Sequence, residues 1–265
     1  MVNLLVAAAI AAASPAIAPA EPAADQPAMF VVRDADTTVY IFGTFHALDD
    51  RSQWFGKQVR DAFEQSNELV LETLVPEQPQ PGPFVPPLRA PSVTPSASFL
   101  ATTRLAINAG RAKGMQVGNG ADMVLRHVAE AEGKPVEGLE TLQFQLNMFN
   151  RLPAASTPPA TAKAGQAVDE KSMQTLSRTM ADMQSAWKRG DQSVFVHLLN
   201  DLRAGSPDTY RMMFTERNAR WADWIAARLQ TPGTVFVAVG AGHLAGTDSV
   251  LVRLAERGIP SQRVY

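Results

Sequence analysis

Short hydrophobic runs near the beginning of the chain predict strands around a helix. Met29–Arg33 and Thr38–Phe42 are rich in β-branched and aromatic residues, and the stretch 34–36 between them predicts a hairpin turn. Gln53–Asn67 then places its apolar residues on one side at helical spacing. Glu68–Glu72 returns as a short strand. Because a strand–helix–strand unit of this length joins parallel strands, we predict a parallel crossover here.

The middle of the chain has mainly helical periodicity, and its last part returns to strands. The predicted elements of the middle are Ser98–Lys113, Ala121–Glu132, a strand at Pro135–Leu139, a helix start and turn at Glu140–Leu152, and the mostly helical segment Val168–Gln230. The last predicted elements are a strand at Thr234–Val239, a helix at Thr247–Arg257 and a strand near Ser261–Tyr265. We therefore expect an α/β (α+β) fold, in which N- and C-terminal strands form a split mixed sheet and the large helical middle forms a cap.

Two segments lack the pattern of any regular element. Residues 76–95 contain eight prolines, which remove backbone donors and fix φ, so neither a regular helix nor a central strand can form there. A second stretch of small residues and prolines covers 153–166. We predict flexible loops at 74–98 and 153–166 within a single domain that covers 21–265.

The first twenty residues differ from the rest of the chain. Leu4–Ala13 is almost purely apolar, and Ala18-Pro19-Ala20 fits the small-x-small pattern of an export cleavage site. We therefore expect a signal peptide at 1–20 and a periplasmic or secreted mature chain. No Lys or Arg precedes the apolar run, and the alternative is a disordered Ala/Pro tail on a cytosolic protein. Further along, no apolar stretch reaches the length expected of an integral membrane span.

Composition narrows the function further. Among 265 residues, 24 Lys and Arg balance 26 Asp and Glu, so the net charge is −2. No strong basic field predicts a nucleic-acid partner. The absence of cysteine excludes disulfides, thiolate metal sites and cysteine catalysis. Patterns of other enzyme classes are also missing: Gly240-Ala241-Gly242 lacks the third glycine of a dinucleotide loop, and neither a G-x-S-x-G elbow nor an H-E-x-x-H helix is present.

Two G-x-x-H elements are the best indication of chemistry. His46 and His243 each follow a predicted buried strand and a glycine, and Glu72 and Glu140 also lie at predicted strand ends. Ligands of α/β proteins gather at the carboxyl ends of strands, so the four side chains could share one pocket. Two imidazoles with one or two carboxylates suit zinc, manganese, cobalt or non-haem iron, which would activate a water. Alternatively, Glu72 caps a turn or pairs with an arginine, and Glu140 is only a favourable charge at a helix start.

A further candidate lies in the predicted helix around Glu216. Arg217 and Trp221 are four residues apart and share a helix face, with Asn218 beside them. An Arg–Asn pair can bind a carboxylate or stabilise an oxyanion. The alternative is a surface arginine over a half-buried tryptophan. His127 and His197 lie inside helical patterns, where a packed or surface histidine is common, so we leave both out of the site.

Together these elements resemble the TraB/PrgY/GumN family, which includes the Tiki metalloproteases. The resemblance runs from about residue 29 to 265, and the segments that carry it are 40–46, 69–73, 138–141 with Gln145, Arg217-Asn218-x-x-Trp221 and 236–244. It implies an α/β core and a divalent metal, with manganese or cobalt for the Tiki branch. By position, His46 and His243 would be metal ligands, Glu72 their acidic partner, and Arg217 and Asn218 would bind substrate or stabilise the transition state.

The resulting hypothesis is an exported, metal-dependent hydrolase that cleaves a peptide bond in a peptide or protein. Glu72 would ligate the metal or act as a base, and the sequence leaves open whether Glu72 or Glu140 is the closer ligand. A second hypothesis is a non-catalytic periplasmic protein that binds a peptide, haem or metal. A third is a family member whose site is intact but idle. The sequence does not indicate the oligomeric state.

Overall fold

The computed structural model describes residues 25–74, 97–151 and 169–265, and for 97–102 the backbone alone. The predicted signal peptide 1–20 and almost all of the two predicted loops at 74–98 and 153–166 lie outside the described residues. No described helix is both long enough and apolar enough to cross a lipid bilayer.

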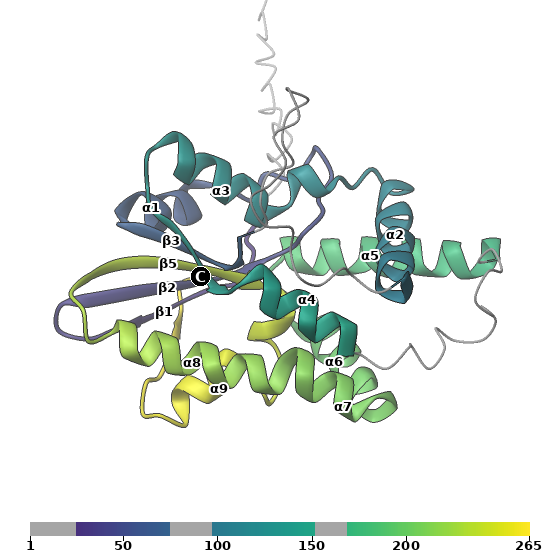
Figure 1. The fold of residues 1–265 in the computed structure, drawn as a ribbon. Coiled ribbons are helices and arrows are strands. Elements are labelled where there is room, and N and C mark those ends of the chain that lie inside the picture. The colour runs from purple at the N-terminus through teal and green to yellow at the C-terminus, as the bar shows by residue number, and fades with distance from the viewer. Residues whose placement is uncertain (1–24, 75–96, 152–168) are drawn as a thin grey trace, which may run out of the picture.

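A mixed sheet of six strands forms the centre of the described structure (Figure 1), in the order β4-β3-β5-β2-β1-β6. Strands β4, β3, β5 and β2 run parallel, and β1 and β6 complete one side as antiparallel strands. The strand bounds are β1 (Met29–Arg33), β2 (Thr37–Thr44), β3 (Glu68–Thr73), β4 (Val136–Glu140), β5 (Gly233–Gly240) and β6 (Gln262–Arg263). The sheet joins both ends of the chain and confirms the predicted α/β fold.

Helices cover both faces of the sheet. Figure 1 shows α1 and α3 on one face and α8 and α9 on the other, with α2 and α5 beyond one end of the strands. The helix bounds are α1 (Lys57–Gln65), α2 (Ala97–Arg111), α3 (Ala121–Ala131), α4 (Leu142–Arg151), α5 (Glu170–Lys188), α6 (Ser193–Gly205), α7 (Pro207–Tyr210), α8 (Glu216–Arg228) and α9 (Val250–Ala255). A π-helical turn at Arg211–Thr215 joins α7 to α8, and a 3₁₀ turn, Ala241–Leu244, follows β5.

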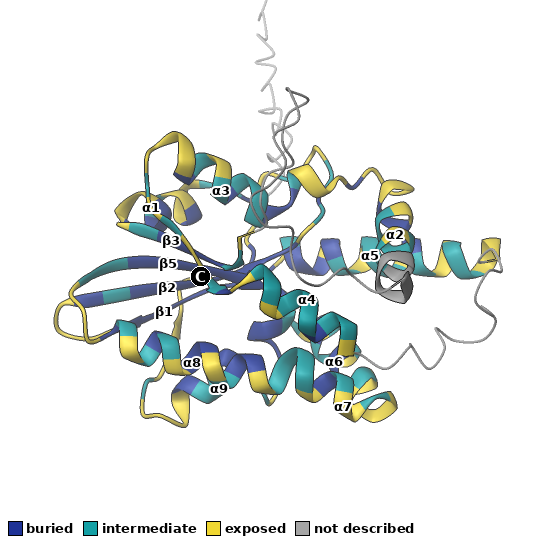
Figure 2. Cartoon of the chain, in the orientation of Figure 1, coloured by how far each residue is buried: buried dark blue, intermediate teal, exposed yellow. Residues whose placement is uncertain are grey.

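Each strand divides its side chains between two hydrophobic layers. In β5, Phe236 and Ala238 pack towards α1 and α3, whereas Val235, Val237 and Val239 pack towards α8 and α9. Strands β1, β2, β3 and β5 are buried over half or more of their residues (Figure 2), which the alternating period of β-structure requires when both faces are covered. This double coverage explains why the predicted strands are continuous apolar runs.

The predicted crossover from β2 to β3 is parallel, but the two strands are not neighbours. Strand β5 lies between them and pairs in parallel with both. The register of β2 on β5 sets Gly43 opposite Val239 and Thr44 opposite Gly240. The two G-x-x-H elements therefore leave the sheet side by side.

The predicted helix at Gln53–Asn67 is shorter in the structure. Helix α1 begins at Lys57, and its N-cap, Gly56, has extended backbone with no side-chain cap. Trp54 is nevertheless buried, so its apolar character reflects packing of the loop before the helix. The predicted helix at Thr247–Arg257 likewise begins only at Val250, where the Ser249 side chain accepts a hydrogen bond from Val252 N.

Candidate functional site

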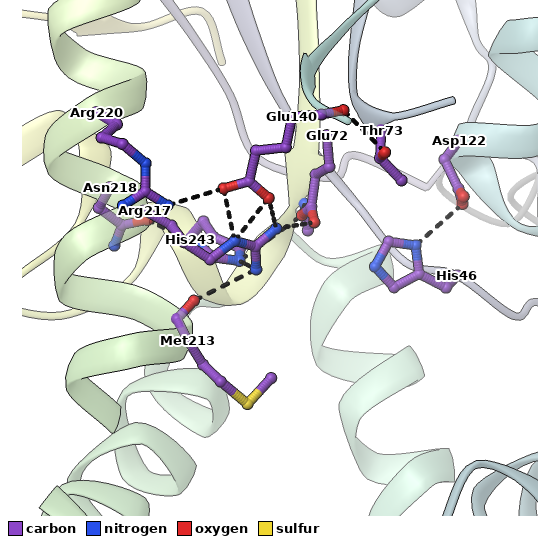
Figure 3. Close-up of polar contacts among 11 residues, drawn as sticks. His46, Glu72, Thr73, Asp122, Glu140, Met213, Arg217, Asn218, Arg220 and His243 are labelled. Carbon is purple, nitrogen blue, oxygen red and sulfur yellow. Dashed lines mark hydrogen bonds and ion pairs between the residues drawn. The ribbon is translucent and has the colours of Figure 1, made fainter. Parts of the chain in front are cut away.

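Three side chains converge where β2, β5 and β3 end. The three side chains surround Gly240. If this glycine carried a Cβ atom, that atom would lie 3.1 Å from Oε1 of Glu72, 3.4 Å from Nε2 of His46 and 3.7 Å from Cδ2 of His243. Gly240 has φ −52°, so its role is to leave space and not to provide an unusual backbone conformation. The strand ends thus bring both predicted histidines and one predicted carboxylate to a single place (Figure 3).

Glu72 is held from two directions. Its Oε1 accepts a hydrogen bond from the backbone N–H of Gly240 at 2.6 Å, and its Oε2 accepts one from Nη2 of Arg217 at 2.9 Å. Burial opposes ionisation, but His243, Arg217, His46 and the Gly240 N–H outweigh it and lower the pKa of Glu72 to about 2. Glu72 is therefore a carboxylate throughout the neutral range.

Arg217 connects the two predicted carboxylates. Its Nε lies 3.1 and 3.0 Å from the two carboxylate oxygens of Glu140, and its Nη2 bridges to Glu72. Its Nη1 donates to the carbonyl of Met213 at 3.3 Å. The guanidinium carbon stacks 4.5 Å from the Trp221 ring centroid, and both side chains are buried. The alternative of a surface arginine over a half-buried tryptophan is therefore wrong.

The hydrogen bonds of His243 fix which of its nitrogens carries the proton. The amide Nδ2 of Asn218 donates to the Asp248 carbonyl at 2.7 Å, so the amide oxygen faces Nδ1 of His243 at 2.6 Å and accepts its proton. The unprotonated Nε2 then points to Nη1 of Arg217 at 3.2 Å and to Oε1 of Glu72 at 3.7 Å. Burial is the largest cause that lowers the pKa of His243, to about 3. The ring is thus neutral, with a lone pair directed into the site.

His46 lies across from this group and has its own carboxylate. Its Nδ1 is 3.2 Å from Oδ1 of Asp122, and its side chain is 60% exposed because it lines the two cavities of the site. The surrounding atoms disfavour the charged ring, but the hydrogen bond and charge of Asp122, with the charge of Glu72, outweigh them and raise the pKa of His46. Asp122 leaves Nε2 of His46 facing Gly240.

The sequence analysis did not identify Asp122. It lies in the first turn of α3, whose start packs tightly against the chain after β2: the N–H of Ala121 donates to Phe45 O at 3.0 Å. A Cβ on Gly120 would lie 2.5 Å from the carbonyl oxygen of His46, so this close approach requires glycine. The Gly120-Ala121-Asp122 sequence indicates at most a helix start, and nothing in it indicates that Asp122 contacts His46, 76 positions earlier.

The structure places the remaining predicted residues behind the point of convergence. Glu140 accepts from Arg217 and, at 3.2 Å, from Nη2 of Arg220, and its side chain is 4% exposed. Asn218 lies behind His243 and lines neither of the cavities described below. Their contacts make Glu140 a partner of Arg217 and Asn218 an orienting residue for the imidazole.

The donors at Gly240 have the chemistry of a transition-metal site. His46 Nε2, Glu72 Oε1 and His243 Nε2 are nitrogen and oxygen ligands that suit zinc, manganese or cobalt. Within the described part of the chain, however, no group of three or more His, Cys, Asp or Glu side chains is already arranged to hold a metal. In the structure, the guanidinium of Arg217 contacts Glu72 Oε2 and His243 Nε2. The donor set fits a divalent ion that competes with Arg217 for the histidine.

Two cavities of opposite character meet at the site. The larger, of about 680 Å³, is lined mainly by apolar residues of α2, α5, α6 and the π-helical turn. The smaller, of about 240 Å³, is more polar: Asp122, Thr73 and Gln145 line it beside apolar residues such as Met123. Thr44, His46, Glu72, Arg217 and Phe149 line both. A ligand that extends from one cavity to the other must pass the converging side chains.

Comparison of the chain with known protein families identifies the family to which it belongs. The model of the TraB/PrgY/gumN family matches residues 28–82 and 87–263, a range that includes all six predicted site residues. Searches of the curated proteins and of the solved structures gave no match. On the extent of the family match, the chain belongs to the TraB/PrgY/gumN family.

Proposed function

We propose that this protein is a divalent-metal-dependent hydrolase that cleaves peptide bonds, as the resemblance to the Tiki metalloproteases implies. The observation that carries the proposal is the convergence of His46, Glu72 and His243 at Gly240. These three residues would hold the ion. When bound, a divalent ion lowers the pKa of a water towards neutrality and polarises a carbonyl.

The surrounding residues would prepare this chemistry. Asp122 and Asn218 each contact Nδ1 of a histidine, which leaves Nε2 of His46 towards Gly240 and Nε2 of His243 towards Glu72 and Arg217. Such partners orient metal-bound imidazoles and tune their basicity. Arg217 lines both cavities, so its guanidinium is placed to stabilise negative charge that develops on a bound substrate.

The proposal includes export of the chain. The apolar stretch Leu4–Ala13 and the small-x-small sequence after it support a signal peptide. Expression of the full chain followed by N-terminal sequencing of the periplasmic or secreted fraction tests this. A mature chain that begins at residue 21 is expected, and full-length protein confined to the cytosol would contradict it.

A specific observation favours a second function, that of a non-catalytic binding protein. Arg217 already pairs with Glu72 and Glu140, and Arg220 adds a second cation at Glu140, so two cations balance the two carboxylates without a metal. In that case the residues around Gly240 would hold a ligand and transform nothing. The hydrolase requires stoichiometric binding of a transition metal, whereas a protein that binds a peptide or haem does not.

Metal content of the purified mature chain therefore tests the proposal. After equilibration with manganese, cobalt or zinc and removal of free ion, we expect about one equivalent bound, and its loss in a His46→Ala/His243→Ala variant. The chain has four histidines, so His127→Ala/His197→Ala is a matched control that should retain the metal. No metal in the wild-type chain after loading with each ion would support the binding protein instead.

A smaller change tests the geometry itself. Gly240→Ala adds one methyl group among the three proposed ligands, whereas Gly242→Ala places its methyl 3.4 Å from the Phe214 ring and away from them. We expect Gly240→Ala to abolish metal binding without unfolding the chain and Gly242→Ala to preserve it. Equal metal content in both variants would contradict a site at Gly240. Hydrolysis of a peptide library by the metal-loaded wild type, absent in Gly240→Ala, would then establish the reaction.

A further inference from the structure

The larger cavity has the dimensions and walls of a ligand-binding site. Its volume of about 680 Å³ falls in the range of pockets that enclose a whole small ligand, and exceeds the size of one side chain severalfold. Four methionines, Met115, Met180, Met183 and Met213, line it with leucine and phenylalanine residues. Methionine is unbranched and flexible, so such walls adapt to a long apolar group.

The walls indicate what kind of apolar group fits. Helices α2, α5 and α6 supply eleven of the lining residues and form the cavity's largest continuous walls, and the interior N–H and C=O groups of a helix are bonded within it. A peptide segment in this cavity would leave its own backbone groups without hydrogen-bond partners, which is unfavourable for each buried group. A hydrocarbon chain carries no such groups. The lining therefore favours an acyl chain over an apolar peptide.

The second cavity indicates what the acyl chain is attached to. It begins at the same His46, Glu72 and Arg217, but polar side chains form a larger share of its walls than in the first cavity. A molecule that occupied both cavities would need a hydrocarbon part and a polar part, with the junction at the converging side chains. This is the arrangement of an acylated polar compound, such as an acyl-peptide.

We infer that the larger cavity binds one unbranched acyl chain and that the ligand's polar part lies in the smaller cavity. The inference deepens the proposed function and rests on it in one respect, namely that the acylated molecule is the one hydrolysed. Binding of the acyl chain needs no metal, because the walls of the larger cavity are mainly apolar. The two proposals can therefore fail separately.

Displacement of a fluorescent fatty acid in the presence of EDTA tests the inference. The probe is 11-(dansylamino)undecanoic acid, and the competitors are unbranched carboxylates of increasing length. We expect binding of one probe per chain, and competitor affinity that rises up to about fourfold per methylene until the cavity is filled. A comparison of N-dodecanoyl-serinamide with dodecanoate then shows which kind of ligand supplies the acyl chain. Tighter binding of N-dodecanoyl-serinamide identifies an acylated molecule, and tighter binding of dodecanoate identifies a free acid.

Cavity-filling variants provide the control. Ala106 lines the cavity from α2, and Asn108 lies on the exposed side of the same helix. Ala106→Phe should weaken dodecanoate at least tenfold and leave hexanoate unchanged, whereas Asn108→Phe should affect neither. Circular dichroism is the check that both variants fold. The inference is overturned if no probe binds, if affinity does not depend on chain length, if acetyl-trileucine amide competes better than dodecanoate, or if Ala106→Phe has no effect.

Discussion

Replacing Arg217 by methionine is the most informative perturbation of stability. The methionine keeps much of the apolar length of the side chain and removes the guanidinium that joins Glu72 to Glu140. Two buried carboxylates would then face each other without that cation. Breaking a buried ion pair by removing one partner costs about 3–5 kcal/mol. Arg220→Met is the matched control, because Arg220 contacts the same Glu140 from a position that is 45% exposed.

The pKa of Glu72 gives a second route to the magnitude. Its shift from an ordinary value of 4.5 to about 2 corresponds to about 3 kcal/mol of stabilisation, shared among all its neighbours. Because the pKa is lowered on folding, this stabilisation is present above pH 4.5 and is lost as pH falls towards 2. In Arg217→Met the pKa of Glu72 rises, because one of the charges that lowered it is gone, and protonation of Glu72 then relieves the repulsion. The deficit of the variant should therefore be largest at neutral pH and smaller at pH 4.

Urea unfolding followed by tryptophan fluorescence at pH 7 and pH 4 measures both effects. We expect Arg217→Met to lose about 3–5 kcal/mol at pH 7 and Arg220→Met to lose less than about 1 kcal/mol. A loss that is equal in the two variants, or a deficit of Arg217→Met that does not shrink on acidification, would refute the assignment of Arg217 as the cation of a buried pair.

The other predictions concern single contacts of the site and its support. Asn218→Ala removes the acceptor at Nδ1 of His243, and calorimetric titration with Mn²⁺ should show affinity reduced by about 10–100-fold; unchanged affinity would argue against an orienting role. Asp122→Asn should lower the pKa of His46, which NMR titration of the ring measures. In the wild type the ring loses its proton only as pH approaches about 9, so metal binding should strengthen less steeply with rising pH in the variant than in the wild type. Identical titrations of the two proteins would contradict this. Trp187→Phe removes a buried 2.7 Å hydrogen bond to a strand-end carbonyl, and should lower stability by about 1–3 kcal/mol in thermal unfolding; an unchanged midpoint would show that another donor replaces the indole.

The strands and the two histidines could be predicted because their signals are local. A buried strand in a doubly covered sheet is a short apolar run, and Gly43 and Gly240 mark where two such runs end. That Gly240 lies among three side chains depends on the register of β2 on β5, which pairs residues almost two hundred positions apart. No local pattern encodes this register.

The relations between charged side chains could not be predicted for a similar reason. Arg217 of α8 was recognised as a candidate, but its partners Glu72 and Glu140 come from two strands, β3 and β4. Its contact with both follows from how α8 crosses the sheet, which depends on the packing of Trp221 and Ile225. Asp122 had no distinguishing signal, because an acidic residue in the first turn of a helix is common for electrostatic reasons alone.

The position of β5 has a consequence for the order of events during synthesis. This strand is the next-to-last of the sheet to leave the ribosome, yet it separates β2 from β3, which are made far earlier. Until residues 233–240 emerge, the strands of the first half have no common partner and Glu72 has no Gly240 N–H to hold it. Such distant pairings slow folding, because the loop must close before any contact compensates its entropy. A nascent chain of this topology therefore cannot complete its sheet, or the site at the strand ends, until the last tenth or so of the chain is made.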